Sequence, residues 1–178
     1  NTNPCGPPPG VLEAFQKADV TRYPDPEALE LRQAIAERHN VPLEAVLPGN
    51  GSVELIWLAA AAYLEPGRSA AVFPPTFGEY QAAASAAGAT IAGTLDDATV
   101  AFLCNPNNPT GTLRPAAEIR HEARAYPNAL VVVDEAYMTF TCGASCLDGG
   151  LIENMVVLRS LTKDCAIPGL RLGYAVGP

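Results

Sequence analysis

The sequence has few basic residues, few imidazoles and no long apolar run. Its 178 residues include 11 lysines and arginines against 19 aspartates and glutamates, a formal net charge of −8 at pH 7. A nucleic-acid-binding or anionic-membrane surface is therefore not expected, although local groups can still bind an anionic ligand. No apolar stretch approaches the roughly 20 residues that span a bilayer. The start, NTNPCGPPPG, also lacks the basic and apolar regions of a signal peptide.

Cysteine is present in an odd number and without a framework pattern. Reduced thiols in a cytoplasmic protein are the simplest interpretation. The stretch CGASC could contribute metal ligands, but neither His39 nor His121 lies at a helpful spacing, so we expect no metal site. The cysteines are Cys5, Cys104, Cys142, Cys146 and Cys165.

The hydrophobic pattern predicts alternating helices and strands after a Pro- and Gly-rich arm at residues 1–24. Continuously apolar strands are typical of a parallel sheet that is buried on both faces by helices. Residues 25–178 are therefore predicted to form one doubly wound α/β domain, a three-layer sandwich with a mostly parallel sheet. We expect helices at 26–40, 53–64, 77–88 and 114–127, and strands at 69–74, 90–95, 99–104, 129–137 and 154–160.

Polar residues gather where three of these strands end. They lie at 105–111 (NPNNPTG), 134–137 (DEAY) and 160–163 (SLTK). In open α/β sheets the ligand crevice lies at the carboxyl ends of the strands. The three segments are therefore predicted to form one site.

Two of the candidate motifs have ordinary structural alternatives. PGNGSVEL places a Gly-rich turn before a helix, which favours an anion such as phosphate at the helix N-terminus. In the alternative, Asn50 and Ser52 are plain helix caps. NPNNPTG fixes a rigid loop that presents an asparagine amide, or it forms an ordinary turn.

The other two motifs contain charged groups. Asp134 directly follows a buried strand and needs a cationic or proton-donating partner, which a structural salt bridge would also supply. Lys163 ends RSLTK, and Arg171 follows in PGLRLGY. An amine beside Arg171 and a helix N-terminus has its protonated form disfavoured, which suits Schiff-base chemistry. The alternative is a solvated surface lysine.

NPNNPTG, DEAY and SLTKDCAIPGLRLGY, in this order, resemble the fold-type I pyridoxal-phosphate enzymes. RYPDPEALELRQAIA and GNGSVELI extend the likeness over nearly the whole chain. More narrowly, the motifs are similar to the histidinol-phosphate aminotransferase branch of the class I/II aminotransferases and to the related threonine-phosphate decarboxylases.

The resemblance implies pyridoxal 5'-phosphate as cofactor and gives each motif a role. Lys163 would form the Schiff base and shuttle protons, Asp134 would pair with the ring nitrogen, and Phe77 would stack on the ring. Asn108 and Tyr137 would bond the ring's phenolic oxygen, and Tyr23 would reach the phosphate of a neighbouring subunit in a homodimer. The phosphate would be held by Gly49, Asn50, Gly51, Ser160, Thr162 and Arg171.

The resemblance also implies an amino-acid substrate and a 2-oxo acid. Relatives continue beyond GYAVG with the rest of the large domain and a small C-terminal domain. We expect this chain to lack both, so that its large domain is incomplete. Transamination is favoured because it is the commoner activity behind these motifs. Threonine-phosphate decarboxylation and a non-catalytic fragment that binds the cofactor stay open as alternatives. A nucleotide-binding Rossmann protein lacks support, since no G-x-G-x-x-G follows the first strand.

Overall fold

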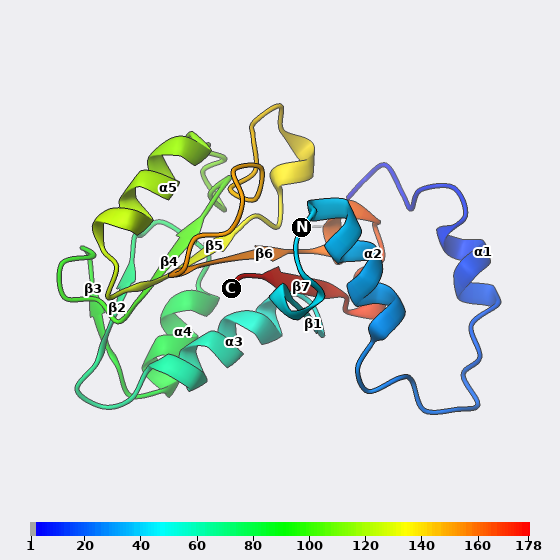
Figure 1. Cartoon of the computed structure of the whole chain (residues 1–178), viewed down its shortest axis with the longest axis horizontal. Helices are drawn as coiled ribbons and strands as arrows, with labels where there is room; N and C mark the ends of the chain where they lie inside the picture. Colours follow the sequence, from blue (N-terminus) through cyan, green and yellow to red (C-terminus); the bar gives the residue numbers. More distant parts are fainter. Residues whose placement is uncertain (1–2) are drawn as a thin grey trace.

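The computed structural model describes residues 3–178 and contains one seven-stranded sheet (Figure 1). Its order is β1-β7-β6-β5-β4-β2-β3. In the part of the sheet formed by β6, β5, β4, β2 and β3, each strand runs parallel to its neighbour. The strand β7 is antiparallel to both β6 and β1. The sheet is therefore mostly parallel, as predicted. The strands are β1 Val46–Gly49, β2 Ser69–Val72, β3 Thr90–Ala92, β4 Val100–Cys104, β5 Leu130–Asp134, β6 Met155–Arg159 and β7 Gly173–Val176.

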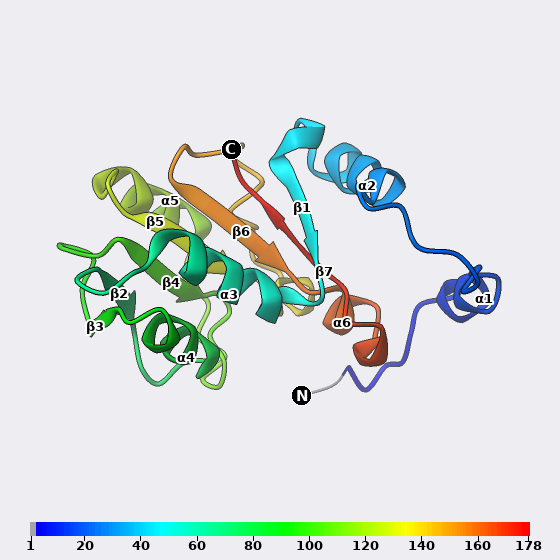
Figure 2. The same cartoon turned by 90° about the horizontal axis from the view of Figure 1, so that it is seen from below.

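Helices cover both faces of the sheet (Figure 2). Alternate residues of β5 show this: Val131 and Val133 belong to the apolar cluster that includes residues of α2 and α5, whereas Val132 belongs to the cluster that includes residues of α3 and α4. The two apolar clusters confirm the three-layer architecture. The helices are α1 Val11–Gln16, α2 Leu29–His39, α3 Ser52–Tyr63, α4 Glu79–Ala86, α5 Ala116–Ala125 and α6 Leu161–Asp164, with short 3-10 turns at Leu43–Ala45, Met138–Phe140 and Pro168–Leu170.

The first long helix starts later than predicted. The pattern placed its start at Pro26, but α2 begins at Leu29. The Asp25 carboxylate accepts the backbone N–H groups of Glu27 at 3.0 Å and Leu29 at 2.9 Å. Ala28 takes a left-handed conformation with φ of 45°. Local bonding by an aspartate side chain therefore delays the helix by three residues.

The N-terminal arm contains the short helix α1, for which the sequence pattern made no prediction. No residue of α1 is buried, and α1 stands apart from the sheet (Figures 1 and 2). The arm returns to the body at Asn3, whose Nδ2 donates to the Lys163 carbonyl at 3.1 Å. The first two residues of the predicted arm lie outside the described residues, and the boundary at residue 24 stays a prediction. None of the helices between residues 3 and 178 has the length and apolarity to cross a bilayer.

Candidate active site

A cavity of about 200 Å³ lies where β4 and β5 end and where α3 and α6 begin. It brings together five of the predicted site residues, which come from four different motifs or loops. The other lining residues are Ser52, Val53, Cys104 and Ala136, and the five predicted ones are Phe77, Asn108, Asp134, Tyr137 and Lys163. The prediction that the ends of successive strands meet in one site agrees with this cavity.

Asp134 lies at the floor of the cavity with 3% of its surface exposed. Its Oδ2 accepts the Tyr80 hydroxyl at 2.8 Å, and its Oδ1 accepts the Ala136 backbone N–H at 3.0 Å. Burial raises the pKa of Asp134, while these hydrogen bonds and the Lys163 charge oppose the rise. The proton-donating partner that the sequence required is thus Tyr80.

Lys163 lies in the single turn of α6 and is half-buried. Its Nζ is 3.4 Å from the Thr162 hydroxyl and 5.9 Å from the centroid of the Tyr137 ring. Neither of these two neighbours is a carboxylate, so neither forms an ion pair with the amine. The amine lines the cavity, so its position does not favour the surface-lysine interpretation.

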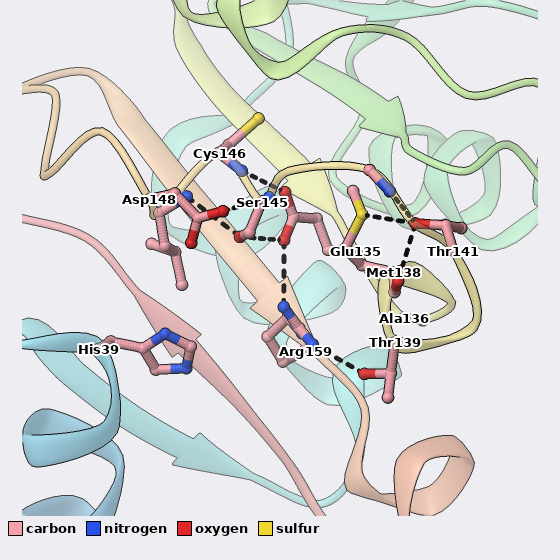
Figure 3. Close-up of polar contacts among 12 residues, drawn as sticks. His39, Glu135, Ala136, Met138, Thr139, Thr141, Ser145, Cys146, Asp148 and Arg159 are labelled. Carbon is pink, nitrogen blue, oxygen red and sulfur yellow. Dashed lines mark hydrogen bonds and ion pairs between the residues drawn. The ribbon is translucent and has the colours of Figure 1, made fainter.

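A buried ion pair fixes the segment that leads into α6 (Figure 3). Glu135 is fully buried and accepts the Ser145 hydroxyl at 2.5 Å and the Cys146 N–H at 2.7 Å. Arg159 Nη1 lies 3.3 Å from the same carboxylate, and its Nη2 donates to Thr139 at 2.9 Å.

Burial raises the pKa of Glu135, and the hydrogen bonds and Arg159 oppose the rise. Arg159 Nη2 is also 3.8 Å from Asp164 of α6. The ion pair therefore connects the residue after Asp134 to the residue after Lys163.

The asparagine-rich loop is built so that one of its asparagines stays available. Asn105 accepts the Arg114 N–H at 2.8 Å and donates to the Arg114 carbonyl at 3.1 Å. Asn107 accepts the Thr76 hydroxyl at 2.7 Å and donates to the Pro75 carbonyl at 2.8 Å. Asn108 instead lines the cavity and, with Tyr137, an adjoining groove of about 300 Å³.

The Gly-rich turn uses its own amides and presents those of the helix. The Asn50 N–H donates to Glu54 at 2.6 Å, and the Gly51 N–H donates to the Gly49 carbonyl at 2.8 Å. Ser52 and Val53, in the first turn of α3, have no intrahelical acceptors for their N–H groups and line the cavity. The unpaired N–H groups beside the cavity are therefore those of Ser52 and Val53, which directly follow the Gly49–Gly51 turn that was predicted to bind phosphate.

Arg171 stands beside this turn. Its Nη2 lies 2.8 Å from the position that a Cβ on Gly51 would occupy, and Gly51 has a φ of 81°. A side chain at position 51 would fill the space between the guanidinium and the N-terminus of α3. The turn thus leaves a small cradle with a positive helix end and a cation nearby.

Seven predicted residues do not line the cavity: the four just described (Gly49, Asn50, Gly51 and Arg171) and Tyr23, Ser160 and Thr162. Ser160 and Thr162 are buried at the start of α6, and their hydroxyl oxygens are 2.7 Å apart. Tyr23 is fully exposed on the arm. The Ser160 and Thr162 hydroxyls hydrogen-bond to each other, and Tyr23 does not line the cavity of its own chain.

Sequence reasoning missed Tyr80, Cys104 and the Glu135–Arg159 pair. Tyr80 lies in an Ala-rich helix, where an aromatic residue indicates only packing. Cys104 ends β4 and lines the cavity, and burial raises the pKa of its thiol to about 11. The one available signal was two adjacent acidic residues, Asp134 and Glu135, at the end of an apolar strand.

An open sheet whose strand ends meet a helix N-terminus, a lysine and a buried aspartate is typical of a ligand-binding α/β protein. The particular family follows from comparison: residues 1–178 match Aminotransferase class I and II. The chain belongs to this family, whose cofactor is pyridoxal phosphate.

Relatives and solved structures agree with this assignment. Histidinol-phosphate aminotransferase of Desulfitobacterium hafniense (strain Y51) is 37% identical over an alignment of 203 positions, which covers 99% of this chain and 56% of the relative. That of Symbiobacterium thermophilum is 38% identical over an alignment of 199 positions, which covers 99% of this chain and 55% of the relative. The chain thus spans little more than half the length of these relatives.

Histidinol-phosphate aminotransferase from Sinorhizobium meliloti, solved in complex with pyridoxal-5'-phosphate, superposes with a TM-score of 0.90 at 26% identity. The match covers 99% of this chain and 54% of that one. L-threonine-O-3-phosphate decarboxylase from Porphyromonas gingivalis superposes with a TM-score of 0.83 at 29% identity, covering 94% and 57%. Both structures support the fold assignment.

Proposed function

We propose that this chain is the cofactor-binding part of a pyridoxal-phosphate-dependent aminotransferase of the histidinol-phosphate type. The observation that carries the proposal is the single cavity that holds Lys163, Asp134, Asn108 and Tyr137. The substrates would be an amino acid or an amino-acid-derived phosphate and a 2-oxo acid. The curated relatives at 37% and 38% identity support this class of substrate.

The residues present fit the cofactor. The cradle between Gly51, Arg171 and the N-terminus of α3 suits a phosphate, because it combines free N–H groups, a helix dipole and a guanidinium. At the other end, Asp134 keeps a carboxylate in a buried position, where a protonated ring nitrogen would stabilise its charge. A flat aromatic ring would lie between these ends, beside Phe77.

When bound, pyridoxal phosphate supplies an aldehyde that takes up amines and a ring that accepts electrons from the substrate's α-carbon. Lys163 would bind the aldehyde through Nζ and later carry a proton on the same atom. Asp134 would hold the proton on the ring nitrogen. Asn108 and Tyr137 would donate hydrogen bonds to the ring's phenolic oxygen, and Phe77 would cover one ring face.

Decarboxylation is the second candidate reaction. The superposition with the threonine-phosphate decarboxylase favours it, at 29% identity. Both reactions need the same cofactor-binding residues. They differ in which bond of the substrate stands perpendicular to the cofactor ring, and hence in how the substrate carboxylate is oriented.

The protein is proposed to be a cytoplasmic homodimer with residues 25–178 as its large-domain portion. In this arm, residues 12–24 are all exposed, Tyr23 among them, and no residue of α1 is buried. Such an arm suits a contact with a second copy, where Tyr23 would reach the partner's cofactor phosphate.

Covalent trapping tests the proposal with a built-in control, because the sequence contains only two lysines, Lys17 and Lys163. The chain is mixed with pyridoxal phosphate, reduced with borohydride and mapped by peptide mass spectrometry. We expect the adduct on Lys163 in the wild-type chain and in Lys17→Ala, and its loss in Lys163→Ala. Lys17 is exposed, forms an ion pair with Glu13 at 2.6 Å and does not line the cavity.

Two outcomes would contradict the proposal. An adduct that persists in Lys163→Ala would remove the lysine from its role. A folded wild-type chain that takes up no cofactor would favour the non-catalytic fragment. If the adduct forms, product analysis with phosphorylated amino acids, for released carbon dioxide against a 2-oxo product, separates decarboxylation from transamination.

A further inference from the structure

Among residues 3–178, Tyr80 is the largest side chain with no exposed surface, and it contacts two residues of the cavity. Its hydroxyl donates to Asp134 Oδ2 at 2.8 Å. The edge of its ring meets Phe77, with centroids 5.7 Å apart and planes at 83°. Its face stacks on Phe102 at 5.4 Å and 9°, so the ring is fixed from behind by β4. The side chain is therefore a rigid support with contacts to both residues.

We propose that Tyr80 is a positioning residue that orients the Asp134 carboxylate and the Phe77 ring toward the cofactor. This inference rests on the proposed function for the identity of the cofactor. The carboxylate has two oxygens, and Tyr80 and the Ala136 N–H bond one each. With both oxygens fixed, the plane of the carboxylate is set, and its remaining lone pairs can face the cavity in one direction only.

The neighbours of Asp134 explain why a hydroxyl is needed at this point. Tyr80 from α4, Cys104 from β4 and Lys163 from α6 are the titratable groups that face the carboxylate. Burial raises the pKa of the Tyr80 phenol, so the hydroxyl keeps its proton and donates it. It stabilises the ionised carboxylate without adding a second charge to compete with the ring nitrogen.

Tyr80→Phe removes only the hydroxyl, and Tyr174→Phe is its matched control. Tyr174 is 2% exposed, and its hydroxyl also makes a 2.8 Å hydrogen bond, to His39 Nε2. The Asp134 titration is followed by carboxylate infrared bands in the chain without cofactor, with Asp134→Asn to assign the band. We expect Tyr80→Phe to raise the Asp134 pKa by about 1–2 units, and Tyr174→Phe to leave it unchanged.

A second measurement uses the wild-type chain and does not depend on the variant folding. The ring carbon that bears the Tyr80 hydroxyl, observed by carbon-13 NMR, should shift over the pH range in which Asp134 titrates. It should stay constant in Asp134→Asn. The proposal would be overturned by a Tyr80 resonance that does not change as Asp134 titrates. It would also be overturned if Tyr174→Phe raised the Asp134 pKa as much as Tyr80→Phe does.

The role toward the cofactor has its own readout. The affinity for pyridoxal phosphate, measured by visible absorbance, should fall about tenfold or more in Tyr80→Phe and should fall further as the pH approaches the raised Asp134 pKa. Equal affinity in the two variants would remove the positioning role while leaving the hydrogen bond intact. Because the titration of Asp134 is measured without cofactor, a failure of covalent trapping on Lys163 is distinguished from a failure of this inference.

Discussion

Gly173 is the residue at which β7 passes closest to the start of α3. A Cβ there would lie 2.6 Å from the Ser52 backbone nitrogen, 2.7 Å from the Gly51 carbonyl carbon and 2.9 Å from the Arg159 carbonyl oxygen. All three atoms belong to the backbone and cannot turn away as a flexible side chain would. The absence of a side chain at position 173 therefore sets the distance between the sheet and the helix N-terminus that would hold the phosphate.

Gly173→Ala should lower the free energy of unfolding by about 1–3 kcal/mol, because the overlap forces backbone shifts. Cofactor affinity should fall as well, since Ser52 must move. Gly78→Ala is the matched control: a Cβ there meets nothing within 4 Å, and the residue has a φ of −65°. Denaturant unfolding and a cofactor titration check both variants. Equal stability of the two variants would show that the close approach at Gly173 is relieved at little cost.

The helix that bears Lys163 is too short to be stable by itself. The few hydrogen bonds of a four-residue helix offset little of the conformational entropy lost on nucleation. The stability of α6 therefore depends on contacts with the rest of the fold. Its turn is closed by the Ser160 carbonyl, which accepts the Lys163 and Asp164 N–H groups at 3.0 and 3.1 Å. The Glu135–Arg159 pair then anchors the strand end from which the turn departs (Figure 3). The position of the lysine is thus a property of the β5 and β6 ends together.

Glu135→Gln should lower the free energy of unfolding by about 3–5 kcal/mol, because it leaves the buried Arg159 charge with only the more distant Asp164 carboxylate, at 3.8 Å. Glu122→Gln is the control, since Glu122 pairs with Arg114 at 2.7 Å where both side chains are partly exposed. We expect a change within about 1 kcal/mol there. Urea unfolding of both variants provides the measurement. A loss in Glu135→Gln no larger than in the control would mean that Arg159 finds other acceptors in the fold.

At the scale of the whole molecule, the sequence predicted the central strands of the sheet but not β1 and β7 at one of its edges. The central strands β4, β5 and β6 are continuously apolar because both faces are buried, and this pattern made their parallel arrangement predictable. The strands β1 and β7 have four residues each and pair antiparallel. VLPG and GYAV are too short and too rich in Gly and Pro to predict a strand by pattern.

The candidate site was predictable as far as its motifs extend along the chain. Lys163, Asp134 and Asn108 lie in distinctive local sequences that end strands, so strand order alone brings them together. Tyr80 is 54 residues from its partner Asp134, and Arg159 is 24 residues from Glu135. Contacts of this kind depend on how helices pack on the sheet, which no local pattern specifies.

His39 connects the first long helix to the last strand. Its Nε2 lies 2.8 Å from the Tyr174 hydroxyl, and the rings are 5.7 Å apart. Burial first, and then the charges of Arg159 and Arg38, lower the pKa of His39 below 6.5, while Asp148 opposes this shift. The folded chain therefore binds fewer protons at this residue than the unfolded chain does. Stability gained from His39 is complete above the unfolded value and is lost as the pH falls from 6.5 through the folded pKa.

His39→Gln should flatten the acid side of the stability profile. We expect the wild-type free energy of unfolding to fall on acidification below pH 6.5, and that of His39→Gln to fall less over the same range. The difference between the two curves isolates His39 from the buried carboxyl groups, whose raised pKa values act in the opposite direction. The control variant is His121→Gln, which replaces an exposed histidine on α5. Urea unfolding between about pH 5 and pH 8 checks this. Parallel curves for the wild type and His39→Gln would mean that His39 is as free to take up a proton in the folded chain as in the unfolded one.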